Sequence, residues 1–227
     1  MSWSRIDDTT FQYDDGGVRF FLLLGSEQAL MIDSGMQVHN AKDLAREITE
    51  LPIRLFNTHL DRDHTGSNGQ FDEILVNPAE LVNNGKEIPS RKIMPVYDGD
   101  VIELGGRALT AIALPGHTPG STALLDRNTG RLFSGDPIQK DGRIFMFGPM
   151  RNLGAYIHSL RRLLSFRAEI REIYPSHATC PIGVEVVDEL IEGALKLERG
   201  EIKPEPVEMF GRTANACDIG VSVLLCD

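Results

Sequence analysis

The sequence predicts an α+β protein in which helices cover layered β-sheets. In each half of the chain, segments with strand character come first and segments with helical character follow, an order typical of layered sheets with helices outside them. No internal repeat, low-complexity segment or linker rich in Gly, Ser or Pro interrupts the 227 residues, and 41% of them are hydrophobic. We therefore predict a single domain over residues 1–227.

The first half of the chain alternates short apolar segments with turn residues. Its predicted strands span residues 6–13, 18–24, 29–32, 52–56 and 74–76. From Ala41 to Ile48, small and apolar residues recur at helical spacing, which predicts a helix over residues 40–49. A shorter helix is expected over residues 78–82, because Pro78 suits a first helical turn.

The second half is predicted to begin with two hairpins and to continue with longer helices. Its predicted strands span residues 100–104, 107–114, 121–126, 131–134, 172–174 and 219–225. Helices are expected over residues 153–166 and 183–197, where apolar side chains recur on one face. That spacing places Tyr156 in the core. The apolar segment 144–150 either lines a substrate cleft, since binding pockets are mostly apolar, or is a packed connector.

Charge and cysteine content narrow the functional classes. The formal net charge of −10 argues against a nucleic-acid partner and against binding to a membrane surface, because both need a concentrated basic face. The apolar runs all fall short of the roughly 18–20 residues that span a bilayer. The three cysteines lie outside any CxxC pattern, and the N-terminus lacks the apolar region of a signal peptide. We expect a cytoplasmic protein with reduced thiols and a small-molecule substrate; the oligomeric state stays open.

Most of the six histidines follow predicted strands and lie beside Gly, Pro, Ser or Asp residues. These are His59, His64, His117 and His177. Asp136 ends a predicted strand in the same way. Side chains at strand ends are held rigidly while they face a shared cleft, as a metal site requires. The remaining His39 and His158 have helical contexts and are expected to be surface or core residues.

The segment of residues 59–64 holds two histidines and two aspartates, Asp61 and Asp63. Two carboxylates this close together need a cation, and imidazole with carboxylate suits zinc, iron or manganese. The alternative is a polar, solvated loop. The density of ligand-type side chains favours a metal site.

Five short motifs, in this order along the chain, resemble those of the metallo-β-lactamase superfamily. They occupy residues 33–35, 58–65, 115–121, 134–136 and 175–177, and the second resembles the signature HxHxDH. The resemblance implies a four-layer αβ/βα sandwich with a binuclear site at one edge. It implies one ion held by His59, position 61 and His117, and another held by Asp63, His64 and His177. It makes Asp136 the bridge between them, and Asp33 the residue that fixes the His59 loop.

Position 61 departs from this signature, because the usual histidine is Asp61. Flavodiiron proteins of the same superfamily carry a glutamate there and bind two irons. Asp61 therefore either ligates the first ion directly, acts through a water, or leaves that ion weakly bound or absent. Three carboxylates and one hydroxide would balance two divalent ions, which favours direct ligation. We expect two divalent metal ions, zinc before iron or manganese.

The resemblance implies a hydrolase that cleaves a small ester, thioester or lactone with a metal-bridging hydroxide. Asp63 would be the catalytic residue that orients the hydroxide and relays a proton. The alternatives are a di-iron oxidoreductase, a phosphodiesterase and a binding protein with a degenerate site. A di-iron oxidoreductase is favoured by the carboxylate at position 61, and a phosphodiesterase is disfavoured by the acidic charge.

Overall fold

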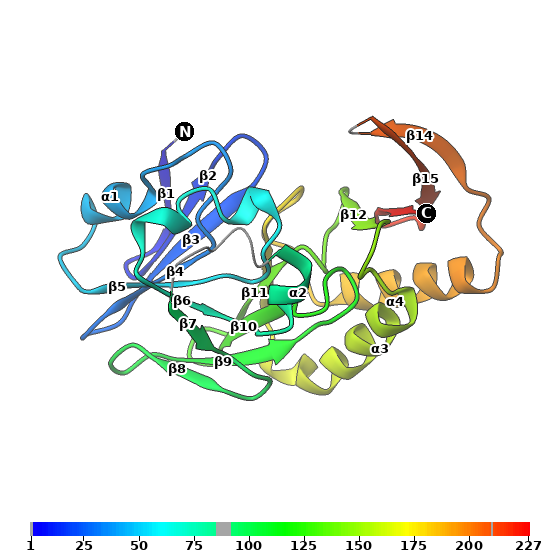
Figure 1. Cartoon of the computed structure of the whole chain (residues 1–227). Coiled ribbons are helices and arrows are strands. Elements are labelled where there is room, and N and C mark those ends of the chain that lie inside the picture. Colours follow the sequence, from blue (N-terminus) through cyan, green and yellow to red (C-terminus); the bar gives the residue numbers. More distant parts are fainter. Residues whose placement is uncertain (1, 85–91, 210) are drawn as a thin grey trace.

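Two β-sheets lie face to face in the computed structural model, which describes residues 2–84, 92–209 and 211–227. Helix α1 (Ala41–Arg46) covers the outer face of the first sheet, and α3 (Leu153–Leu163) and α4 (Glu185–Glu198) cover the outer face of the second (Figure 1). The predicted α+β class and four-layer αβ/βα sandwich are confirmed. That residues 1–227 form a single domain stays a prediction.

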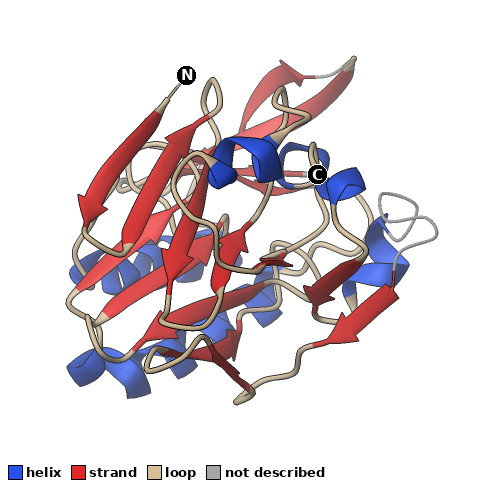
Figure 2. Cartoon of the chain, turned by 90° about the vertical axis from the view of Figure 1, so that its left-hand side faces the viewer, coloured by secondary structure: helices blue, strands red, loops and turns tan. Residues whose placement is uncertain are grey.

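The first sheet has seven strands whose spatial order follows the chain. They are β1 (Trp3–Asp7), β2 (Thr10–Asp14), β3 (Arg19–Leu24), β4 (Ala29–Ile32), β5 (Ile53–Phe56), β6 (Glu73–Val76) and β7 (Lys92–Pro95). Pairing is antiparallel from β1 to β4 and parallel from β4 to β7. The parallel strands therefore end at one edge of the sheet. Figure 2 views the molecule from the side of this sheet.

The second sheet has the strand order β13-β11-β10-β9-β8. These strands are β8 (Val101–Glu103), β9 (Ala108–Ala113), β10 (Thr122–Asp126), β11 (Arg131–Gly135) and β13 (Glu172–Pro175). A four-stranded sheet lies beside α3 and α4 and consists, in order, of β12 (Arg143–Met146), β16 (Val223–Cys226), β15 (Arg212–Asp218) and β14 (Glu205–Met209) (Figure 1). Strands β11 and β13 are parallel, so their ends also share one edge.

Side-chain alternation along β3 shows how the layers are joined. Phe20 and Leu22 belong to the apolar cluster that includes Ala41 of α1. Phe21 and Leu23 point to the opposite face and pack in the cluster between the two sheets. Because β3 is buried on both faces, it reads as a nearly continuous apolar run in the sequence.

Several predicted element boundaries were wrong. Residues 6–13 form a hairpin of β1 and β2, because the Asp7 side chain accepts a hydrogen bond from the Thr9 amide (2.8 Å) and closes a turn. The predicted strand 219–225 begins only at Val223, after a turn in which the Gly220 amide donates to Asp218 (2.8 Å). Strands β7, β12, β14 and β15 were not predicted. The predicted helix 78–82 is α2 (Glu80–Asn84), and the helix predicted over 153–166 continues past α3 as a 3-10 turn (Leu164–Glu169).

Candidate metal centre

The candidate metal ligands lie on loops that leave the two facing sheets at one edge. Asp33 directly follows β4, and His59 lies shortly after β5. Asp136 directly follows β11, and His177 lies shortly after β13. His117 reaches the same place from the loop between β9 and β10. Each sheet thus contributes ligand-type side chains from strand ends, as the sequence predicts.

The loop that carries His117 is held closely against α3. Gly116 has a φ of +142°, and a Cβ at this position would lie 2.4 Å from the Tyr156 Cα. The Tyr156 hydroxyl donates to the Pro137 carbonyl oxygen (2.9 Å), and the side chain is fully buried, so its predicted core position is confirmed. Only glycine therefore allows this approach of loop and helix.

Asp33 connects the first sheet to the loop of His59. It is buried, and it accepts hydrogen bonds from the Thr58 amide and the Thr58 hydroxyl, both at 2.8 Å. Its Oδ2 also lies 2.8 Å from His64 Nδ1. Asp33 has a φ of +61°, a strained value for a residue other than glycine. These contacts agree with the predicted role of Asp33 in fixing the loop.

The candidate histidines share one orientation, in which Nδ1 contacts an oxygen and Nε2 faces the cluster. The oxygens are Thr58 Oγ1 for His59 (3.0 Å), Asp33 Oδ2 for His64 (2.8 Å), the Phe145 carbonyl for His117 (2.8 Å) and the Gly17 carbonyl for His177 (2.7 Å). Because Thr58 donates its hydroxyl hydrogen to Asp33, its oxygen accepts from His59. These acceptors assign hydrogen to Nδ1 and leave the Nε2 lone pairs free, the tautomer typical of metal-binding histidines.

The free ring nitrogens and carboxylates form two groups, each with ligand atoms within 4.8 Å of one another. The first is His59, His117 and Asp136; the second is Asp63, His64, Asp136 and His177. Asp136 belongs to both: its Oδ1 lies 3.2 Å from His64 Nε2 and 3.3 Å from His177 Nε2, and its Oδ2 lies 3.7 Å from His117 Nε2. Apart from Asp61, these are the two ligand sets expected from the sequence.

The carboxylates of this cluster attract positive charge strongly. Burial opposes a charged His64 ring, but Asp63, Asp136 and Asp33 outweigh it and raise the pKa of His64 well above its ordinary value. Burial likewise opposes a charged His177, yet Asp136 and Asp63 raise its pKa to about 10. Protons therefore take the positions where a cation would compensate the same carboxylates.

Unsatisfied buried atoms at the cluster show that a metal ion fits these residues. When His64 is neutral with its hydrogen on Nδ1, its Nε2 and Asp136 Oδ1 face each other at 3.2 Å as two acceptors, and neither has a hydrogen-bond partner within the described ranges. His59 Nε2 and His117 Nε2 face each other at 3.3 Å, although both carry lone pairs in the assigned tautomers. Buried polar atoms in this state are costly, and a cation between them removes the cost. Imidazole and carboxylate donors suit zinc, iron or manganese.

Asp61 has a different environment from the other candidate ligands. Its Oδ2 lies 3.5 Å from His117 Nε2 and 3.8 Å from His59 Nε2, but also 2.6 Å from Arg151 Nη2. Its Oδ1 accepts a hydrogen bond from Asn84 (3.0 Å). Burial opposes its ionisation, but His117, His59 and Arg151 hold the pKa of Asp61 well below its usual range. Asp61 thus lies beside the cluster, while its carboxylate is already bound by the Arg151 guanidinium and the Asn84 side-chain amide.

A pocket of about 500 Å³ opens over the cluster. Its lining residues are Met36, Asp61, Arg62, Asp63, Asp136 and Phe145. The two predicted alternatives for segment 144–150 are both partly right: residues 143–146 form the packed strand β12, while Phe145 lines the pocket.

The sequence did not single out Arg151, Asn84 or Met36, because none belongs to a motif. An arginine beside an apolar segment was the only signal for Arg151. His39 contacts the Gly66 carbonyl oxygen (3.0 Å), and both His39 and His158 are exposed, so their expected structural placement is consistent with the structure.

Comparisons with known proteins agree with this geometry. Residues 13–177 match the family model of the metallo-beta-lactamase superfamily. The chain is 29% identical over 206 residues to acyl-coenzyme A thioesterase MBLAC2 of Gallus gallus, covering 73% of this chain and 74% of that protein. It is 27% identical over 165 residues to atrochrysone carboxyl ACP thioesterase of Emericella nidulans, covering 71% of this chain and 51% of that protein.

Solved structures show the same fold at low sequence identity. A metallo-beta-lactamase from Pontibacter korlensis superposes with a TM-score of 0.69 at 15% identity, covering 84% of this chain and 96% of that one. The family match spans the loops that carry Asp63, His117 and Asp136, and ends at His177. The chain therefore belongs to the metallo-beta-lactamase superfamily.

Proposed function

We propose that this chain is a metal-dependent thioesterase that hydrolyses acyl thioesters of coenzyme A or of an acyl carrier protein. The observation that carries the proposal is the pair of ligand groups sharing Asp136 on the floor of a pocket that also has apolar walls. The similarity to relatives named as thioesterases supports the choice of a thioester among the ester-like substrates.

The proposed metal sites are the two groups defined by geometry. Asp63, His64 and His177 would hold one ion, His59 and His117 the other, and Asp136 would bridge them. When bound, two divalent ions, which we expect to be zinc, lower the pKa of water and polarise a carbonyl oxygen.

Among the described residues, every helix is too short or too polar to span a bilayer.

Asp63 is the proposed catalytic residue. Its carboxylate lines the pocket, and its Oδ2 lies 3.1 Å from His177 Nε2 and 3.6 Å from His64 Nε2. Burial opposes ionisation, but these two histidines lower the pKa of Asp63, so the carboxylate is charged at neutral pH. As water adds to the thioester carbonyl carbon and the C–S bond breaks, Asp63 takes the proton from the water and returns it to the leaving thiolate.

The apolar walls fit the acyl chain of the substrate. Met36 is 44% exposed although it is a large apolar side chain, and it lines the pocket together with Phe145. Each methylene group that leaves water contributes about 0.8 kcal/mol, so kcat/KM should rise roughly fourfold per carbon while the pocket has room. Phe145 also accepts from His117 through its backbone, which joins the wall to the proposed site.

A substrate panel tests this function. Zinc-loaded protein would be assayed with acyl-CoA of increasing chain length, a lactone, a β-lactam and a phosphodiester. Thioesters should be hydrolysed fastest, and Asp63→Asn and His117→Ala should each lower kcat/KM by about a hundredfold or more. His158→Ala, which alters an exposed helical histidine, is the matched control and should retain the wild-type rate.

Faster turnover of the phosphodiester, or full activity in Asp63→Asn, would contradict the proposal. Protein that purifies with iron and consumes oxygen would point instead to a di-iron oxidoreductase. Metal analysis of the purified protein should therefore accompany the panel.

A further inference from the structure

Asp61 is held by a polar network on the side away from the histidines. Arg151 Nη2 donates to Asp61 Oδ2 (2.6 Å), and Arg151 Nη1 donates to Asn83 Oδ1 (3.1 Å). The amide nitrogens of Asn83 and Asn84 donate to Asp61 Oδ1 at 3.3 and 3.0 Å. The Arg151 side chain is only 12% exposed, and that of Asp61 is 21% exposed, so solvent screens their attraction poorly.

Both sides of this network are anchored to the loops of the proposed metal site. Glu80, which begins α2, is buried and accepts hydrogen bonds from the Leu60 amide (2.9 Å) and the Gly120 amide (2.7 Å). Asn152, next to Arg151, donates its amide to the Gly116 carbonyl (2.9 Å). The positions of Asn83 and Arg151 relative to Asp61 are therefore fixed by the same loops that position His59 and His117.

The two ligand groups differ in the negative charge that they offer. The group of His64 and His177 has the carboxylates of Asp63 and Asp136. The group of His59 and His117 has only the shared Asp136, because the charge of Asp61 is balanced by Arg151. Since the attraction of a divalent ion grows with the charge of its ligands, the group of His59 and His117 should bind more weakly.

We propose that Arg151 neutralises Asp61 and thereby makes the His59–His117 site the weaker, exchangeable one of two metal sites. The inference rests on the proposed metal centre and adds a positioning residue to it. Within the described part of the chain, Asp61 is the candidate ligand with which Arg151 forms a hydrogen bond and an ion pair. Its effect is on metal affinity, and it acts through Asp61.

Metal titration tests this role without any activity assay. Metal-free protein would be titrated with zinc against a chromophoric chelator. The wild type should show two dissociation constants at least tenfold apart. In Arg151→Met the weaker constant should fall by about tenfold or more and the tighter one should stay within threefold, because the charge of Asp61 is then no longer balanced and attracts the ion held by His59 and His117. Arg167→Met, whose arginine pairs with Asp188 on a helical surface, is the control and should change neither constant.

A double-mutant cycle identifies Asp61 as the route. In an Asp61→Asn background the guanidinium has lost its charged partner, so Arg151→Met should change the weaker constant by less than threefold. Arg151→Gln provides the same readout if the methionine variant does not fold.

Equal affinities in the wild type, or unchanged constants in Arg151→Met and Arg151→Gln, would overturn the inference and leave the proposed function intact. Zinc binding that persists undiminished in His64→Ala would instead contradict the metal centre itself.

Discussion

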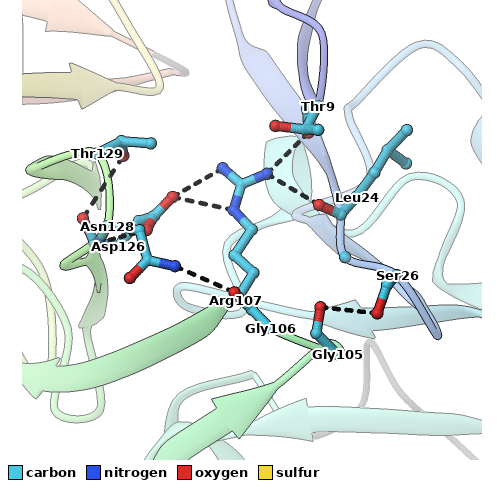
Figure 3. A pocket seen from close by; sticks show the side chains of 10 residues that line it. Thr9, Leu24, Ser26, Gly105, Gly106, Arg107, Asp126, Asn128 and Thr129 are labelled. Atoms are coloured by element: carbon cyan, nitrogen blue, oxygen red, sulfur yellow. Dashed lines mark hydrogen bonds and ion pairs between the residues drawn. The ribbon is translucent and has the colours of Figure 1, made fainter.

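Two of the buried polar clusters in the described part of the chain differ in how completely the protein satisfies them. The first surrounds Arg107, which is 6% exposed. Its Nε and Nη2 bind Asp126 Oδ2 at 2.9 and 2.8 Å, and Nη1 donates to the Thr9 and Leu24 carbonyls (Figure 3). Nη2 also donates to the Thr10 hydroxyl oxygen (2.9 Å). The guanidinium thus joins strands of both facing sheets and has its donors fully used.

The second cluster is the proposed metal centre, where two polar atoms lack a hydrogen-bond partner. His64 Nε2 and Asp136 Oδ1 are buried without hydrogen-bond partners in the described part of the chain. The contrast supports a structural role for Arg107 and Asp126, and it is what the proposed metal centre requires. In the pocket of about 370 Å³ beside Arg107, by contrast, the charged side chain already has its partners within the protein.

The largest expected effect comes from breaking the buried ion pair of Arg107 and Asp126. Arg107→Met would leave Asp126, which is fully buried, without its cation, and we expect a loss of about 3–5 kcal/mol in the free energy of unfolding. Urea unfolding in the presence of zinc measures this. Zinc stoichiometry should not change. A loss below about 1 kcal/mol would show that solvent screens the Arg107–Asp126 pair as it does a surface ion pair.

Replacing both partners sharpens the same point. Arg107→Met combined with Asp126→Leu removes the charge together with its counter-charge, so most of the lost stability should return. If the double variant were as unstable as the single one, packing around Arg107 rather than the unpaired carboxylate would account for the loss.

Metal removal should give the next largest effect on stability, and this effect should arise at the proposed metal centre and not at the Arg107 cluster. Chelation of zinc-loaded protein should lower the free energy of unfolding by about 3 kcal/mol when free zinc had been near a hundred times its dissociation constant. The loss caused by Arg107→Met should be the same with and without chelator, because the two clusters share no residue. If chelation left the free energy of unfolding unchanged, the proposed metal centre would be contradicted.

The two clusters also differ in how far the sequence predicted them. The candidate ligands were predictable because short local motifs place them after strands, as with His59 after β5 and Asp136 after β11. Arg107 carries no such signal, since its partners Thr9 and Asp126 come from distant segments. Arg151 was missed for the same reason: it lies 90 residues after Asp61 in the chain.

The fold shows the same division between local and distant causes. The doubly buried strands β3 and β4 were predicted because nearly all their side chains are apolar. Strand β14 was missed because it is largely exposed and has no clear alternation of apolar and polar residues. It exists through its pairing with β15, a partner that composition does not reveal.

The smallest expected effect on stability comes from an ion pair that is only partly buried. Asp7 on β1 binds Arg131 on β11, and their side chains are 33% and 16% exposed. Burial opposes ionisation, but the hydrogen bond and charge of Arg131 lower the pKa of Asp7 from 3.8 to about 2. The pair therefore stabilises the fold above the unfolded-state pKa, and this contribution is lost as the pH falls through about 4 to about 2.

Asp7→Asn should cost no more than about 1 kcal/mol at pH 7, because a partly exposed ion pair is weak. The difference between wild type and variant should shrink between pH 5 and pH 3 in urea unfolding. If the difference stayed constant over this range, packing of β1 and not the charge of Asp7 would make the contribution. If Asp7→Asn cost as much as Arg107→Met, the degree of burial would not determine how much each ion pair contributes to stability.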